Sequence, residues 1–271
     1  MQEHFLHIFT VWISGGISQK TAKQGRMMKT RQESSHSWQG KSLRVHVLHS
    51  RAGVAQHIWI SNDHGAVLID AGDGLLRDIL AGRLGFDRIR GIFFTHGHFD
   101  HMGGLHTLLG FLRMIGRKDP LPIAAPEGCT EVFSTVDEFK RCYAGTIPFD
   151  ISCKTIQPHE ISRIAGMSLE AYPVIHCGGI EGSEILKQIP AFGYKISYKG
   201  ETVAISGDTG DCPSLRELVT GADLAILEAT YESSDEVSSE TLRKVHLSED
   251  LAEEIGHLAE SHILIHKGRR T

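Results

Sequence analysis

The segment Thr95–His101 concentrates the residue types that bind metal ions in proteins. Its sequence, Thr-His-Gly-His-Phe-Asp-His, places His96, His98, Asp100 and His101 close together, where a predicted buried strand gives way to a helix. Because side chains two residues apart in an extended chain point to the same side, His96 and His98 can face one cation. Asp100 and His101 lie at the turn that opens the helix and can face a second cation beside the first.

Three further candidate ligands, His176, Asp208 and His266, each come at or shortly after the end of an apolar stretch that predicts a buried strand. A single histidine after a strand more often has an ordinary structural role, so each residue is weak evidence by itself. Together with the first segment they supply five imidazoles and two carboxylates. This donor set suits two divalent metal ions, with Zn²⁺ favoured by the many histidines and Mn²⁺ or Fe as alternatives.

The elements around these residues predict two β-rich halves with helices outside. The first half reads as an antiparallel meander, a helix, a buried strand and a second helix led by the histidine segment, and the second half repeats this order after the hairpin over 192–206. The main expected elements are strands at 44–49, 57–61, 66–70, 91–95, 122–125, 150–156, 168–175, 192–198, 201–206, 224–228 and 263–265, and helices at 75–84, 131–143, 214–220 and 247–261. We therefore expect one α/β domain over residues 42–271, a four-layer αββα sandwich of two mixed sheets covered by helices.

Composition and charge exclude several classes of protein. The 271 residues carry a formal net charge of -5, so the global basic field of a non-specific nucleic-acid binder is absent. The five cysteines are an odd number without CxxC spacing, which indicates neither a disulfide framework nor a thiolate zinc site and fits a reducing cytoplasm. Residues 1–41 predict a disordered or loosely attached N-terminal extension, and its apolar run is too short to cross a membrane.

The segment Thr95–His101 resembles the signature of the metallo-β-lactamase superfamily, whose fold is the helix-covered two-sheet sandwich expected above. Several later features are similar to ribonuclease Z and its phosphodiesterase relatives, and the resemblance covers about residues 42–271. These features are Gly72 in the turn 69–72, the runs 105–110 and 122–128, His176 followed by Gly193-Tyr194, Ser206-Gly207-Asp208-Thr209, Glu228-Ala229-Thr230, His246 and His266.

The resemblance implies a role for each candidate residue in a dinuclear hydrolase that uses a metal-bridging hydroxide as nucleophile. It implies that His96, His98 and His176 hold one metal, that Asp100, His101 and His266 hold the other, and that Asp208 bridges them. Glu228 and His246 correspond to a pair that shuttles protons to the departing alkoxide. Asp70 resembles an acid that supports a metal-bound histidine, although it could equally cap the following helix, and Arg270 lies where relatives hold phosphate.

The sequence also departs from ribonuclease Z. That family commonly has a long arm that clamps tRNA, whereas residues 194–206 here predict a bare hairpin, and Leu227 stands where the family has a histidine. Polyanion binding depends on Lys and Arg contacts, so a small phosphodiester or short nucleotide is a better candidate substrate than folded tRNA. Its pocket walls are expected at 177–191 and 131–143, Cys177 is expected to pack rather than react, and a homodimer is possible.

Two other functions stay open. The same metals would equally activate water against a carbonyl carbon, as in a lactone, thioester or β-lactam. A metal-bound adaptor without turnover is a third reading, which would require damage to the ligand set, and none is visible in the sequence. The Glu228 and His246 pair favours phosphodiester hydrolysis, because expelling an alkoxide requires a proton donor.

Overall fold

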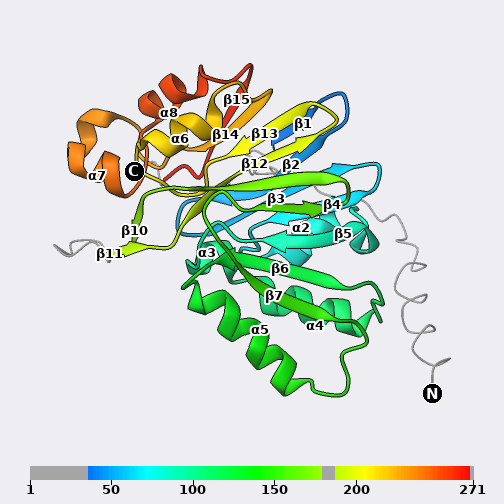
Figure 1. The fold of residues 1–271 in the computed structure, drawn as a ribbon. Helices are drawn as coiled ribbons and strands as arrows, with labels where there is room; N and C mark the ends of the chain where they lie inside the picture. The colour runs from blue at the N-terminus through cyan, green and yellow to red at the C-terminus, as the bar shows by residue number, and fades with distance from the viewer. Residues whose placement is uncertain (1–35, 179–186, 269–271) are drawn as a thin grey trace, which may run out of the picture. The chain divides into compact units, whose positions relative to one another are not determined.

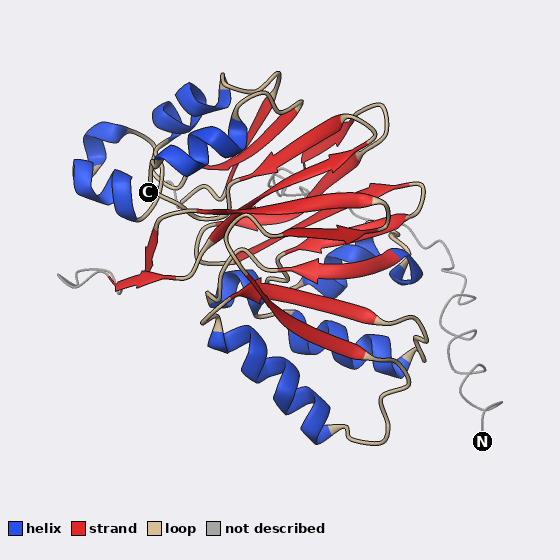
Figure 2. Cartoon of the chain, in the orientation of Figure 1, coloured by secondary structure: helices blue, strands red, loops and turns tan. Residues whose placement is uncertain are grey.

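The computed structural model describes residues 36–178 and 187–268. They form two large mixed sheets packed face to face, with helices outside each sheet, so the predicted αββα sandwich is confirmed (Figure 1). None of the described helices is long and apolar enough to cross a bilayer. Figure 2 shows the strands gathered in the middle of the molecule and the helices on its two outer sides.

The first sheet has seven strands, which follow one another in chain order. Strands β1 to β4 pair antiparallel, whereas β4 to β7 pair parallel and are joined by helical crossovers. The strands are β1 (His36–Gln39), β2 (Arg44–Arg51), β3 (Ala55–Asn62), β4 (Gly65–Ile69), β5 (Ile89–Phe93), β6 (Leu121–Pro126) and β7 (Ile151–Ile156).

The second sheet has six strands in the order β15-β14-β13-β12-β9-β8. Its antiparallel part runs from β8 to β13, and β13, β14 and β15 are parallel. The strands are β8 (Ile161–Ile164), β9 (Met167–Pro173), β12 (Phe192–Tyr198), β13 (Glu201–Ile205), β14 (Leu224–Glu228) and β15 (His262–Ile265). A separate antiparallel pair is formed by β10 (His176–Gly178) and β11 (Lys187–Ile189).

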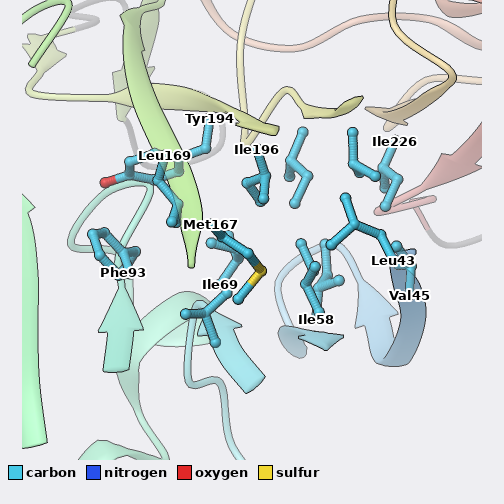
Figure 3. Packing of buried hydrophobic residues seen from close by; sticks show 14 of the residues in the cluster. Leu43, Val45, Ile58, Ile69, Phe93, Met167, Leu169, Tyr194, Ile196 and Ile226 are labelled. Atoms are coloured by element: carbon cyan, nitrogen blue, oxygen red, sulfur yellow. The ribbon is translucent and has the colours of Figure 1, made fainter. Parts of the chain in front are cut away.

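The core between the sheets follows the period of two that strands impose on their side chains. In β3, Ile58 and Ile60 point toward the second sheet, while Trp59 between them packs among the helices on the other face. Figure 3 shows aliphatic side chains of the first sheet meeting Met167, Ile196 and others from the second. Both faces of the strand are therefore buried, which explains why its central run Ile58–Ile60 is apolar without alternation.

Helices with one apolar face cover each sheet. In α5, Val132, Val136 and Phe139 keep helical spacing and are fully buried against the first sheet, as predicted. Helices α4 and α5 lie outside β6 and β7, and α6 and α8 lie on the opposite side of the sandwich (Figure 1). The helical segments are α2 (Leu75–Ala81), η1 (Phe86–Arg88), α3 (Phe99–Met102), α4 (Leu105–Met114), α5 (Thr130–Cys142), α6 (Pro213–Val219), η2 (Ser234–Glu236), α7 (Ser239–Lys244) and α8 (Glu249–Gly256).

Some element boundaries differ from the sequence predictions. Strand β1 pairs with β2 although its residues lie within the expected 1–41 extension, so the sheet begins before residue 42. Residues 1–35 of that extension lie outside the described residues. The helix expected over 247–261 ends at Gly256, where a Cβ would lie 2.5 Å from the ring of His262. The chain must turn there to enter β15. Strand β8 and helix α7 were not predicted, because both are short and neither contains a run of apolar residues.

The carboxyl ends of the parallel strands of both sheets carry the candidate site. Asp70 follows β4, His96 follows β5 after two residues, and Asp208 follows β13. Glu228 is the last residue of β14, and His266 follows β15 directly. Ligand sites of α/β proteins lie outside such strand ends, because there the chain leaves the sheet and its side chains are free to converge.

Glu201 joins the two sheets, because its buried carboxylate accepts hydrogen bonds from the backbone N–H groups of Lys41, Ser42 and Leu43 at 2.6, 2.8 and 2.7 Å. Burial alone would raise the pKa of this carboxyl, but these donors lower it by more, so the net pKa lies below its ordinary value. We expect Glu201→Gln to destabilise the fold by about 1–3 kcal/mol at neutral pH, since an amide offers only one acceptor oxygen to these donors.

The sign of the pH dependence follows from the lowered pKa. A carboxyl whose folded pKa is depressed contributes stability above its unfolded pKa and loses it as the pH falls through the folded pKa. Urea unfolding should therefore show the gap between the native chain and Glu201→Gln shrinking as the medium is acidified below the ordinary carboxyl range. Glu217→Gln, at an exposed position on α6, is the matched control. It should change neither the free energy of unfolding nor the dependence of that free energy on pH. A gap that stays constant with pH would contradict this assignment.

Candidate metal centre

The structure brings all seven sequence-predicted metal ligands together. The first group contains three histidines and an aspartate whose potential ligand atoms lie within 4.8 Å of one another, and the second contains two histidines and an aspartate under the same limit. The first group is His96, His98, His176 and Asp208, and the second is Asp100, His101 and His266. The residues come from four separate stretches of the chain, so their convergence is a property of the fold.

Distances between imidazole nitrogens match those of neighbouring ligands on one cation. His98 Nδ1 lies 3.2 Å from His176 Nε2 in the first group, and His101 Nε2 lies 3.4 Å from His266 Nε2 in the second. Two nitrogens at roughly 2.0–2.1 Å from a tetrahedral Zn²⁺ are separated by about 3.3 Å. The spacing in both groups therefore fits two metal subsites.

Asp208 lies between the two groups. Its Oδ2 is 3.9 Å from His96 Nε2 on one side, and 3.3 and 3.5 Å from the Nε2 atoms of His101 and His266 on the other. Its carboxylate is 2% exposed. Burial alone would raise the pKa of Asp208, but the surrounding imidazoles, His101 and His266 foremost, hold it well below its ordinary value. The ionised carboxylate is thus placed to contact cations in both subsites.

Hydrogen bonds on the outer side of the rings orient the histidines. His101 Nδ1 is 2.8 Å from Asp70 Oδ2, and His176 Nδ1 is 2.8 Å from the carbonyl oxygen of Val245. Because a carboxylate and a carbonyl can only accept, both Nδ1 atoms donate, and Nε2 is the nitrogen of each ring that faces the centre. Asp70 therefore has the supporting position that the resemblance implied, and the alternative of capping α2 is wrong, because Gly74 is the N-cap residue of that helix.

The backbone is tightly constrained around the ligands. A Cβ on Gly72 would lie 2.3 Å from the carbonyl oxygen of Asp100, so only glycine allows the Asp70–Gly72 turn to pack against α3. Asp70 and His266 both have positive φ, 63° and 53°, which is uncommon for residues with a side chain. Such strain persists where the surrounding structure imposes it, and it is concentrated at functional sites.

Two buried ligand atoms lack a hydrogen-bond partner among the described residues, as expected of atoms that bind cations. His96 Nε2 and Asp208 Oδ1 are buried and have no hydrogen-bond partner in this part of the chain. Burial is the main cause that lowers the pKa of His96 and brings that of His176 to about 3, so these two imidazoles are neutral. Burial also opposes protonation of His101, but Asp208 and Asp70 outweigh it and raise the pKa of His101 well above its ordinary value. Neutral imidazoles and an ionised carboxylate are the protonation states that bind divalent metals, and a cation in the second subsite would displace the proton of His101, so the residues present fit two such ions.

His246 lies beside both subsites and is held by Glu228. His246 Nδ1 is 2.8 Å from Glu228 Oε1, and the ring centroid of His246 is 5.0 Å from that of His176 and 5.7 Å from that of His266. Burial opposes protonation of His246, but Glu228 outweighs it and raises its pKa to about 9. His246 also groups with Asp208 and His266 by distance, although its Nδ1 is already engaged by Glu228.

Several contacts at the site were missed by sequence reasoning. The backbone N–H of Gly53 donates to Asp100 Oδ2 at 2.9 Å, and Ser50 Oγ accepts from the N–H of His266 at 2.9 Å. The turn after β2 therefore supports the second subsite, although no side-chain motif marks it. The hydroxyls of Thr95 and Thr230 contact His96 and His266. The signal for these threonines was their position near residues already predicted for the site, His96 for Thr95 and Glu228 for Thr230.

Two features predicted from the sequence lie partly or wholly outside the described residues. Arg270 and the centre of the expected pocket wall at 177–191 lie outside the described residues. Cys177 is 5% exposed, and burial raises the pKa of its thiol, which is consistent with its predicted packing role. The other expected wall, α5, is described, and a Cβ on Gly97 would lie 2.4 Å from Glu131 Oε2, so the first turn of α5 lies against the ligand segment.

Comparison with curated proteins finds relatives named ribonuclease Z. The ribonuclease Z of Ignicoccus hospitalis is 26% identical over 197 residues, which are 60% of this chain and 65% of that protein. The chain thus spans slightly less than two thirds of the length of this relative.

Solved structures share the fold across most of the chain. The short form of human tRNase Z matches with a TM-score of 0.68 at 22% identity and covers 83% of this chain and 93% of its own. A diphosphatase from the PhnP family matches with a TM-score of 0.62 at 22% identity, covering 83% of this chain and 87% of its own. The family model for the β-lactamase superfamily domain matches residues 66–266, a range that contains all seven candidate ligands. Together with the sandwich fold, this match shows that the chain belongs to the metallo-β-lactamase superfamily.

Proposed function

We propose that the protein is a dinuclear metal-dependent phosphodiesterase. The observation that carries this proposal is the arrangement of two ligand groups around one shared carboxylate, Asp208, beside the hydrogen-bonded pair Glu228 and His246. Two cations a few ångströms apart suit the in-line displacement at phosphorus, because both the attacking and the leaving oxygen carry charge. The naming of the relatives as ribonuclease Z supports a phosphodiester substrate.

The ligands would divide between two ions. His96, His98 and His176 would hold one, Asp100, His101 and His266 would hold the other, and Asp208 would bridge them. Five imidazoles favour Zn²⁺, and Mn²⁺ or Fe would accept the same donors. When bound, the cations would lower the pKa of a coordinated water and stabilise the charge that develops on the phosphoryl oxygens.

The residues of the chain would supply positioning and proton transfer. Glu228 is fully buried, and its Oε1 accepts from His246 Nδ1, so the other ring nitrogen, Nε2, is left to exchange protons with substrate. A protonated His246 would donate to the departing alkoxide oxygen as the phosphorus–oxygen bond breaks. The Glu228 carboxylate would fix the ring and stabilise its charged form. Asp100 and Asp208 would contribute to catalysis as the two carboxylates that hold the ions.

We infer that the substrate is a small phosphodiester or a short nucleotide. Strands β12 and β13 pair up to Tyr198 and Glu201, so only Lys199 and Gly200 join them, and no arm extends between them. The formal charge of -5 gives folded tRNA few cationic contacts. The match to a diphosphatase is consistent with small substrates on this fold.

Metal analysis followed by turnover of three substrate types tests the proposal. The purified protein should contain close to two divalent ions per chain and should hydrolyse bis(p-nitrophenyl) phosphate. A lactone and a β-lactam, tested beside it, should react slowly or not at all. Rapid cleavage of the lactone with an inert phosphodiester would replace this proposal with a carbonyl hydrolase. Full metal loading without any turnover would favour an adaptor.

A further inference from the structure

The hydroxyl of Thr230 connects a metal ligand to the proton-transfer pair. Thr230 Oγ1 lies 2.9 Å from Glu228 Oε2 and 3.2 Å from His266 Nδ1. Glu228 thus contacts Thr230 through one carboxylate oxygen and His246 through the other. A continuous path of hydrogen bonds therefore runs from His266 through Thr230 and Glu228 to His246.

The chemical nature of each group decides which atom donates and which accepts in the hydrogen bonds of this path. Glu228 also accepts from the backbone N–H groups of Thr209 and Thr230, at 3.0 and 3.1 Å, so its ionised carboxylate acts only as an acceptor. The Thr230 hydroxyl has one proton. It can go to Glu228 or to the carbonyl oxygen of His266 at 3.1 Å, and the shorter, charge-assisted contact to Glu228 is the stronger. His266 Nδ1 must then donate to Thr230 Oγ1, which leaves His266 Nε2 as the atom that faces the second subsite.

The first half of the sandwich contains the same arrangement. Thr95 Oγ1 donates to Asp70 Oδ2 at 2.9 Å and lies 3.0 Å from His96 Nδ1. The same Asp70 oxygen accepts from His101 Nδ1 at 2.8 Å. In each half a threonine hydroxyl thus lies between a ligand histidine and a buried carboxylate that holds a second histidine. In the first half that second histidine is a ligand, whereas in the second half it is His246.

We propose that Thr230 is a positioning residue that couples the second metal subsite to the proton donor. Its hydroxyl fixes the Nδ1–H tautomer of His266, and so its metal-binding nitrogen, and at the same time orients the Glu228 carboxylate that holds His246. Loss of the hydroxyl removes both effects together. The part of this inference that concerns catalysis rests on the proposed phosphodiesterase function, whereas the part that concerns metal binding does not.

Thr230→Val removes the hydroxyl with little change of shape, and Thr230→Ser restores it. We expect Thr230→Val to weaken binding of the second Zn²⁺ by about 10-fold or more, the range typical of lost hydrogen bonds to a ligand histidine, and Thr230→Ser to recover most of it. Zinc titration of the metal-free proteins measures this directly. Thr202→Val is the matched control, because Thr202 Oγ1 donates to Asp223 Oδ2 at 3.0 Å at the opposite end of β13 from the site.

The catalytic part is tested with two leaving groups at saturating zinc. In Thr230→Val, kcat should fall more for thymidylyl-thymidine, whose alkoxide leaving group needs a proton, than for bis(p-nitrophenyl) phosphate, whose phenolate does not. Equal losses on both substrates would overturn the link to His246. If wild-type protein cleaves neither substrate, the proposed function fails while the zinc titration still decides the coupling to the metal subsite.

A separate measurement on the unaltered chain does not depend on the variants folding. Nitrogen-15 imidazole spectra of the zinc-loaded protein should show the proton of His266 on Nδ1. A proton on Nε2, or zinc affinity that changes no more in Thr230→Val than in Thr202→Val, would overturn the proposal.

Discussion

Asp208→Ala is expected to release at least one of the two cations and to lower kcat for bis(p-nitrophenyl) phosphate by more than about 100-fold. Loss of a residue that only orients a ligand costs 10–100-fold in metal affinity or activity, and Asp208 is placed to contact both ions directly. Without it, five imidazoles would surround two divalent ions with Asp100 as the one remaining carboxylate of the ligand set. Elemental analysis of the dialysed protein, together with the rate assay, measures both effects.

Asp211→Ala is the matched control for this experiment. Asp211 is also an aspartate of the segment after β13, but it forms a paired contact with Arg216 at 3.0 Å instead of facing the histidines. This variant should keep two cations and its rate, with at most a modest loss of stability from a half-exposed ion pair. Retention of both ions by Asp208→Ala would refute the bridging assignment, and loss of ions from both variants would point to general unfolding.

Much of the fold could be predicted, because burial constrains the sequence strongly. Strand β4, and strand β14 up to Leu227, are apolar on both faces, since they pack between the opposite sheet and the covering helices. Strand β8 lacks this apolar pattern. It lies at the edge of its sheet, and its four residues alternate between exposed and buried positions with a serine buried among them. Edge strands carry weaker patterns because one side of their backbone and often one face contact solvent.

The ligands of the site could be predicted more completely than the residues that support them. His176 and Asp208 were identified because they follow strands and bear donor atoms, and parallel strands of one sheet end at a common edge. The N–H of Gly53 and the hydroxyl of Ser50 support the second subsite without any distinctive residue type. Their role depends on how the turn after β2 is placed against α3 and β15, and such long-range placement leaves no periodic signal in the sequence.

Replacement of the proton donor His246 should lower the rate of the chemical step without loss of metal. His246→Ala should lower kcat for thymidylyl-thymidine by about 10²–10⁴-fold, the usual contribution of a positioned general acid. Hydrolysis of bis(p-nitrophenyl) phosphate should fall much less, because p-nitrophenolate leaves without a proton. Zinc content should stay at the wild-type value, since His246 Nδ1 is bound to Glu228 and the two ligand groups are complete without it.

His257→Ala is the control for the loss of an imidazole near α8, which His246 precedes and His257 follows. His257 is exposed at the end of α8, and its ring contacts the carbonyl oxygen of Glu253 instead of the site, so both substrates should react at wild-type rates. Two results would contradict the role of His246. Zinc lost from His246→Ala would make His246 a ligand, a role that its distances to Asp208 and His266 also allow. Equal rate losses on the two substrates would mean that His246 acts on substrate binding, because only a proton donor discriminates between an alkoxide and a phenolate.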